Sequence, residues 1–187
     1  MEERTPQQEF EVRLVSVPRI GIASLLEWLQ GTDFMRAPAS TRFHGAHEGG
    51  LLEHSLAVHD RLIGLDGHFG LGLAEDSMAL CALLHDVCKA DCYVRDFRNV
   101  KDERGQWHRV PCYRFEEKFP YGGHGAKSVY LVQHFVDLKP EEAAAINCHM
   151  GQFEATQYGR PSDVYAKNAL AWALHVADEA ASFIDNK

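Results

Sequence analysis

The chain has 187 residues, of which 45% are hydrophobic and 25% charged, and its formal net charge is −8. This length and composition predict one globular domain with a sizeable core. The negative charge argues against an extended basic surface for nucleic acid, and the lack of a long apolar run argues against a membrane span.

The cysteines and the N-terminus bear on the cellular compartment. The chain contains 5 cysteines, an odd number, and none of them forms a Cys-x-x-Cys pair. This pattern indicates a reducing compartment without a disulfide framework. The segment Met1-Glu-Glu-Arg-Thr-Pro6 is charged and lacks the apolar stretch of a signal peptide, so a cytoplasmic location is expected.

The N-terminal residues are polar and precede the main helical region. Residues 1–20 are expected to form an N-terminal arm, ahead of a single domain over residues 21–187. Within the arm, residues 11–17 have a β-like sequence that ends at Pro18, which predicts a short strand. A short helix is predicted over residues 22–29.

A loop and a longer helix come next. The loop, residues 32–50, is rich in Pro, Ser, Thr and Gly and carries Arg42, His44 and His47. The helix is predicted from Leu51 to about Leu65, before a glycine-rich turn over residues 64–72. One of its faces holds residues at helical spacing: Leu51, His54, Ser55, Val58 and Leu62. His54 is therefore expected to point inward.

The following helix delivers a histidine and a carboxylate side by side, as His85-Asp86. Imidazole and carboxylate are good ligands for Zn²⁺, Mn²⁺ and Fe. Lys89, three residues further on, could hold a phosphate oxygen. A second such pair, His59-Asp60, shows that the dipeptide alone carries little weight.

Residues 91–121 change character and predict a β-hairpin inserted into a helical protein. Two strand-like stretches, residues 92–97 and 107–115, flank a polar turn, and Pro111 makes the second an edge or irregular strand. Residues 89–118 hold 8 Lys and Arg against 6 Asp and Glu. Two interpretations are open: a solvated hairpin, or a mildly basic wall for an anionic substrate.

Three helices are predicted after the hairpin. They cover residues 126–136, 140–149 and 162–184, with a loop at residues 152–161. His124 precedes the first helix, where the helix dipole favours anions, and His149 ends the second. Asp178 lies in the third among alanines, and a buried carboxylate requires a partner such as a metal ion. The fold is expected to be mostly α.

Ligand-type residues thus occur at helix ends or on inward faces: His54, His85, Asp86, His124, His149 and Asp178. Their order resembles the two-metal variant of the HD-domain metal-dependent phosphohydrolases, from about Arg42 to Ala180. The segments that carry this resemblance include Gly49-Gly-Leu-Leu-Glu-His-Ser-Leu56 and Leu83-Leu-His-Asp-Val-Cys-Lys89. The first is similar to the HD domain of some bacterial 3′–5′ exoribonucleases and to small stand-alone HD hydrolases. The oligonucleotide-binding domain of those nucleases has no counterpart here, so an exonuclease assignment does not follow.

The resemblance implies an HD-domain helical bundle and hydrolysis of a phosphoester bond by metal-activated hydroxide. The substrate would be a nucleotide or another small phosphorylated molecule. One or two divalent transition-metal ions are expected (Fe, Mn, Zn, Co or Ni, with Mg also allowed). His54, His85, Asp86 and Asp178 would bind one ion, and Asp86 would bridge to a second ion held by His124 and His149. Asp86 and Lys89 are the expected catalytic residues, while Lys89, Arg42 and His47 are assigned to substrate binding.

Two alternatives remain. Di-iron oxygenases use the same scaffold, and His124 and His149 permit such a site, although Lys89 favours hydrolysis. A non-catalytic nucleotide-binding module is the other alternative, and it would be expected to have lost ligands. Oligomer formation is also left open, because apolar hairpin residues could cover the site or form an interface.

Overall fold

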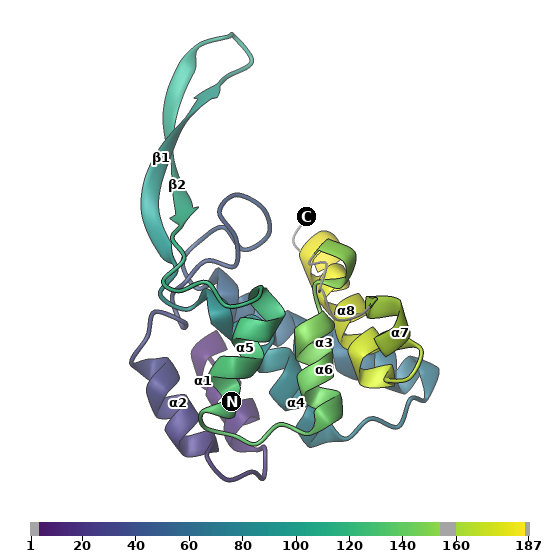
Figure 1. The fold of residues 1–187 in the computed structure, drawn as a ribbon. Helices are drawn as coiled ribbons and strands as arrows, with labels where there is room; N and C mark the ends of the chain where they lie inside the picture. The colour runs from purple at the N-terminus through teal and green to yellow at the C-terminus, as the bar shows by residue number, and fades with distance from the viewer. Residues whose placement is uncertain (1–3, 154–159, 186–187) are drawn as a thin grey trace.

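The computed structural model describes residues 4–153 and 160–185, and it shows a mostly helical protein from which a β-hairpin projects (Figure 1). The helices are α1 (Pro6–Val15), α2 (Ile22–Gln30), α3 (Gly50–Phe69), α4 (Glu75–Leu84), α5 (His124–Gln133), α6 (Pro140–Cys148), α7 (Pro161–Tyr165) and α8 (Ala169–Ala180). Short helical turns lie at Val87–Lys89, Gly151–Phe153 and Ala181–Asp185. The hairpin consists of β1 (Tyr93–Lys101) and β2 (Trp107–Phe115). The predicted mostly α fold with an inserted hairpin is confirmed.

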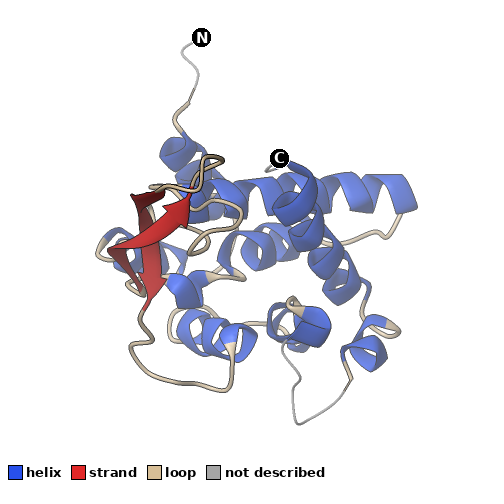
Figure 2. Ribbon diagram, turned by 90° about the horizontal axis from the view of Figure 1, so that it is seen from above, coloured by secondary structure: helices blue, strands red, loops and turns tan. Residues whose placement is uncertain are grey.

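Two hydrophobic clusters hold the helical body together. One joins α1, α2 and α4 and includes Phe10, Leu25 and Leu80. The other joins α3, α6 and α8 and includes Leu62, Ile146 and Leu174. Figure 2, viewed from above, shows the two strands over one side of this body. Among the helices of the described residues, none combines the length and the apolar character that crossing a membrane requires.

The strand predicted for residues 11–17 is wrong, because residues 11–15 belong to α1 and residues 16 and 17 follow its end. The Gln8 N–H donates to Thr5 Oγ1 at 3.2 Å, and the Gln8 side-chain oxygen accepts from the Thr5 N–H at 3.0 Å. This reciprocal cap defines the start of the helix. Phe10 and Leu14, one turn apart, are then both buried in the core. The division of the chain at residue 20 into an arm and a domain stays a prediction.

Two other helix boundaries differ from the prediction. The helix predicted over residues 162–184 is interrupted, because Asn168 starts α8 by accepting a hydrogen bond from the Ala171 N–H at 3.2 Å. α3 is longer than predicted and runs to Phe69, where Gly70 ends it with a φ of 60°. The loop predicted at residues 152–161 lies mostly outside the described residues.

α5 and α6 approach closely at Gly125, next to His124. A Cβ atom on Gly125 would lie 2.7 Å from the Cα of Asn147 in α6, and closer still to its carbonyl oxygen. Gly125→Ala is therefore expected to lower the free energy of unfolding by about 1–3 kcal/mol, measured by urea denaturation. Gly64→Ala is the matched control, because it lies in α3 with no atom within 4 Å of the added methyl. It is expected to raise stability by about 0.5–1 kcal/mol, and equal losses in both variants would contradict the close approach.

Candidate metal centre

Four helices bring five ligand-type side chains into one buried group. α3 carries His54, His85-Asp86 directly follows α4, His149 directly follows α6, and α8 carries Asp178. Each of these side chains is buried, with at most 8% relative exposure. Residues far apart in the sequence therefore share one small volume inside the helical body.

Asp86 is the central member of this group. Its Oδ2 atom lies 3.4 Å from His85 Nε2 and 3.8 Å from His54 Nε2. Its Oδ1 atom lies 3.5 Å from His149 Nε2. Asp178 Oδ1 completes the group at 3.1 Å from His54 Nε2 and 3.9 Å from His85 Nε2. All three imidazole rings thus direct Nε2 toward the carboxylates.

Backbone hydrogen bonds define the proton positions on two of the rings. His85 Nδ1 lies 2.8 Å from the Ala82 carbonyl oxygen, and His149 Nδ1 lies 2.7 Å from the Ile146 carbonyl oxygen. Because a carbonyl oxygen only accepts, each Nδ1 must donate its proton. In the neutral ring each Nε2 then presents a lone pair. The ends of α4 and α6 therefore both orient the rings and select the tautomer that binds metals.

The Nε2 lone pairs of His85 and His149 face the oxygens of Asp86, so that hydrogen-bond acceptors face one another with no donor between them. Asp86 Oδ1 and His149 Nε2 are buried and have no hydrogen-bond partner among the described residues. Such an arrangement is unfavourable unless a proton or a cation lies between the atoms. Imidazole and carboxylate donors suit Zn²⁺, Mn²⁺ and Fe. The group therefore fits a metal ion, which its buried His and Asp residues can hold.

Lys89 keeps Asp86 ionised. Burial alone would raise the pKa of Asp86, but the positive charge of Lys89 outweighs it and holds the pKa well below its usual value. Lys89 Nζ lies 2.6 Å from Asp86 Oδ2 and donates to the Ala39 carbonyl oxygen at 2.9 Å. A metal ligand must be deprotonated, and Asp86 is held in that state.

A second group of ligand-type atoms shares Asp86. Atoms of Asp86, Cys88 and His124 all lie within 4.8 Å of one another. Cys88 is not among the ligands predicted from the sequence, where its only signal is its position two residues after Asp86. Burial and the neighbouring Asp86 raise the pKa of Cys88 to about 12, so its sulfur is a neutral thiol. The Cys88 N–H donates to Ser128 Oγ at 3.2 Å, which joins this turn to α5.

Comparison with known proteins points to phosphoester chemistry. The chain is 35% identical over 69 residues to a dihydroneopterin 2′,3′-cyclic phosphate phosphodiesterase from Methanocaldococcus jannaschii. The match covers 35% of this chain and 28% of that enzyme, well under a third of the relative's length. No family model and no solved structure matches the chain. A partial relative that is named as a phosphodiesterase supports a phosphoester hydrolase in general.

In the loop before α3, Arg42 and His47 are exposed, whereas His44 lies against the buried group. The Arg42 guanidinium lies 5.0 Å from the Phe43 ring centre, and exposed His47 pairs with Glu53 at 3.5 Å. His44 is the ring of this loop that lies against the buried group, with its centre 4.8 Å from that of His54. Burial and His54 lower the pKa of His44 to about 4. The predicted role of Arg42 and His47 in substrate binding stays a prediction.

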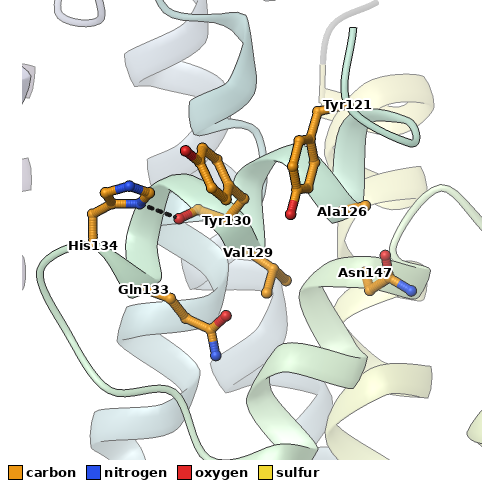
Figure 3. Close-up of a pocket in the computed structure, with 7 residues that line it drawn as sticks. All are labelled: Tyr121, Ala126, Val129, Tyr130, Gln133, His134 and Asn147. Carbon is orange, nitrogen blue, oxygen red and sulfur yellow. Dashed lines mark hydrogen bonds between the residues drawn. The ribbon is translucent and has the colours of Figure 1, made fainter.

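A hollow of about 460 Å³ at α5 and α6 is separate from the metal-ligand group (Figure 3). The residues that line it are Tyr121, Ala126, Val129, Tyr130, Gln133, His134 and Asn147. The rings of Tyr121 and Tyr130 stack there with centres 4.5 Å apart, and His134 Nδ1 donates to the Tyr130 carbonyl oxygen at 2.7 Å. The lining contains none of the predicted ligands, so this hollow is not the candidate metal centre.

Proposed function

We propose that the chain is an HD-type metal-dependent phosphohydrolase that acts on a nucleotide or another small phosphorylated molecule. The observation that carries the proposal is the position of Asp86, which two groups of ligand-type residues share. In the proposed site, His54, His85, Asp86 and Asp178 hold one ion, and Asp86, His124 and His149 hold a second. The phosphodiesterase relative supports the same chemistry.

The chain's own residues would position and balance the charges of the reaction. Bound divalent cations would supply an acidified water as the nucleophile and positive charge for the phosphoryl oxygens. Lys89, which is already beside Asp86, would hold a phosphate oxygen of the substrate. His175 Nδ1 donates to the His149 carbonyl oxygen at 2.7 Å, so it holds the end of α6 on which His149 lies.

Metal analysis and a substrate panel test the proposal. Protein purified without added metal would be analysed for bound ions, then assayed with Mn²⁺, Co²⁺, Fe²⁺ and Mg²⁺. The panel should contain phosphomonoesters and phosphodiesters, including 2′,3′-cyclic nucleotides, since the relative is named for a cyclic phosphate. We expect turnover of at least one phosphoester. No turnover of any panel compound with metal bound, or oxygen uptake by the iron-loaded protein that depends on a candidate substrate, would contradict the proposal.

Lys89→Met is expected to lower kcat about 10²–10³-fold while the metal content is retained. The substitution removes the positive charge beside the phosphoryl oxygens but leaves every proposed ligand in place, and a bound divalent cation would itself keep Asp86 ionised without Lys89. Steady-state kinetics and metal analysis on the same preparation measure the two effects. Lys89→Arg is the matched control, which keeps the charge and should keep part of the activity. Loss of metal together with activity would instead show that Lys89 acts by holding Asp86.

A further inference from the structure

One face of the hairpin interleaves aromatic rings with cations. Residues directly opposite each other in an antiparallel pair project to the same face, and alternate residues along a strand share a face. The pairs on this face are Tyr93–Phe115, Arg95–Tyr113, Phe97–Pro111, Asn99–Arg109 and Lys101–Trp107. All the Phe, Tyr and Trp residues of the two strands therefore lie on one side, together with three cations. We call this side the aromatic face.

The side-chain contacts agree with this placement. The Tyr93 ring centre lies 5.3 Å from that of Phe115. Further out, the Arg109 guanidinium carbon lies 4.3 Å from the Phe97 ring centre, and Lys101 Nζ lies 5.5 Å from that of Trp107. Trp107 is 68% exposed and Phe97 is 53% exposed. Large exposed rings on a projecting element (Figure 1) mark a surface that binds a partner.

The charge of the hairpin is opposite to that of the whole chain. The two strands contain five Lys and Arg residues and one acid, Asp96, whereas the chain has a net charge of −8. Asp96 lies on the opposite face and pairs with Arg114 at 3.2 Å. On the aromatic face, Arg95 forms an exposed pair with Glu48 at 2.9 Å, which contributes little and is easily exchanged. A polyanion is therefore attracted to this face, although the net charge of the chain repels it.

The aromatic face begins beside the candidate metal centre. The Tyr93 hydroxyl donates at 3.1 Å to the Ala39 carbonyl oxygen, which also accepts from Lys89 Nζ. The Phe115 ring centre lies 6.0 Å from that of His124. Nine paired residues extend from this base to the tip, a length of about 30 Å at roughly 3.3 Å per residue. The aromatic face thus extends continuously from the tip of the hairpin to the predicted ligands.

We propose that the aromatic face binds single-stranded nucleic acid. Unpaired bases stack on Trp107, Phe97 and Tyr113, and backbone phosphates bind Lys101 and Arg109. Stacking platforms beside cations are how proteins bind single strands without reading sequence, and a duplex does not expose its base faces to them. This differs from the expectation drawn from net charge, because net charge averages over the chain and binding depends on the local surface. Delivery of the strand end to the metal centre rests on the proposed function, whereas the binding itself does not.

Fluorescence anisotropy of a labelled single strand of about ten nucleotides tests the proposal on the full chain without added metal. Trp107→Ala and Phe97→Ala are each expected to weaken binding roughly 5- to 150-fold. Lys101→Ala and Arg109→Ala should each reduce the slope of log affinity against log salt by about 0.7. Val100→Ala and Arg98→Ala on the opposite face are the matched controls, and they should change affinity less than about twofold.

Three results would overturn the inference. Equal affinity for a duplex of the same length would exclude stacking on unpaired bases. If Arg98→Ala and Arg109→Ala weakened the affinity for the single strand equally, general attraction by charge would explain the binding, and no specific face of the hairpin would be involved. Absence of binding at low salt, with a dimer in light scattering that Trp107→Ala dissociates, would assign the face to a second copy of the chain. Binding of the single strand does not require the metal centre, so it should persist in Asp86→Ala. Absence of turnover across the phosphoester panel would therefore contradict the proposed function without contradicting this inference.

Discussion

Asp86→Ala is expected to lower metal content and phosphoester hydrolysis together, each by more than about 100-fold. Loss of a group that only supports a metal ligand costs 10–100-fold in metal affinity or activity, so loss of a direct ligand should cost more. Asp86 faces His85, His54 and His149 through its two oxygens, so both proposed ions depend on it. Elemental analysis of protein purified without added metal, beside steady-state kinetics, measures the result.

The second His-Asp pair of the chain provides the control for this prediction. Asp60 is exposed and pairs with Arg13 at 2.5 Å, outside the buried group. Asp60→Ala should therefore keep both metal and activity. Asp86→Asn preserves the side-chain volume and should behave as Asp86→Ala does, with circular dichroism confirming the fold of each variant. An unaltered metal content in either Asp86 variant would refute the proposed ligand set.

Arg19→Met is expected to lower the free energy of unfolding by about 3–5 kcal/mol, because it removes the closest cation of a buried carboxylate and leaves only the half-exposed Lys139 at 3.5 Å. Arg19 Nη1 and Nη2 donate to the two oxygens of Glu142 at 2.8 and 2.6 Å, and Nη2 also donates to Asp76 Oδ2 at 2.6 Å. Glu142 is 0% exposed and lies in α6, whereas Arg19 precedes α2. The network therefore joins distant parts of the chain. Urea denaturation measures the loss.

The loss of stability in Arg19→Met should also depend on pH. Burial would raise the pKa of Glu142, but hydrogen bonds from Arg19 and Ser77 hold it below its ordinary value of 4.5. Because the folded-state pKa is depressed, this contribution is fully present above the unfolded pKa and is lost as pH falls through the folded value. In Arg19→Met, burial dominates and the pKa of Glu142 rises, so protonation favours the folded variant. The stability difference between the two chains should narrow from pH 7 to pH 4.

Two further variants separate this explanation from general damage. Glu142→Gln added to Arg19→Met removes the uncompensated charge and should recover part of the stability. Arg61→Met breaks only an exposed pair with Asp185 and should change stability little at any pH. A stability difference for Arg19→Met that stays constant with pH would show that lost packing, rather than charge, causes the effect.

The sequence predicted those features that depend on residues close together along the chain. Apolar residues at helical spacing predicted α3 with His54 on its inward face, and the strand-like stretches with a polar turn predicted the hairpin. The error at residues 11–17 arose because a short β-like run was weighed without the cap six residues upstream. The Thr5–Gln8 cap is itself a local signal, and it agrees with the burial of Phe10 and Leu14 one turn apart.

By itself, the sequence determined the mostly helical class, the inserted hairpin and the residue types suited to a metal, because periodicity and chain order express these directly. Only the tertiary structure decided which side chains meet. The close approach of α5 and α6 at Gly125, the contact of His44 with His54, and the place of His124 beside Asp86 all depend on packing between distant segments. The aromatic face likewise depends on strand register, since a shift of one residue would send Trp107 to the opposite side from Phe97. The spacing of residues in the sequence specifies which of them share a face of a helix or strand, whereas contacts between distant segments specify what that face packs against.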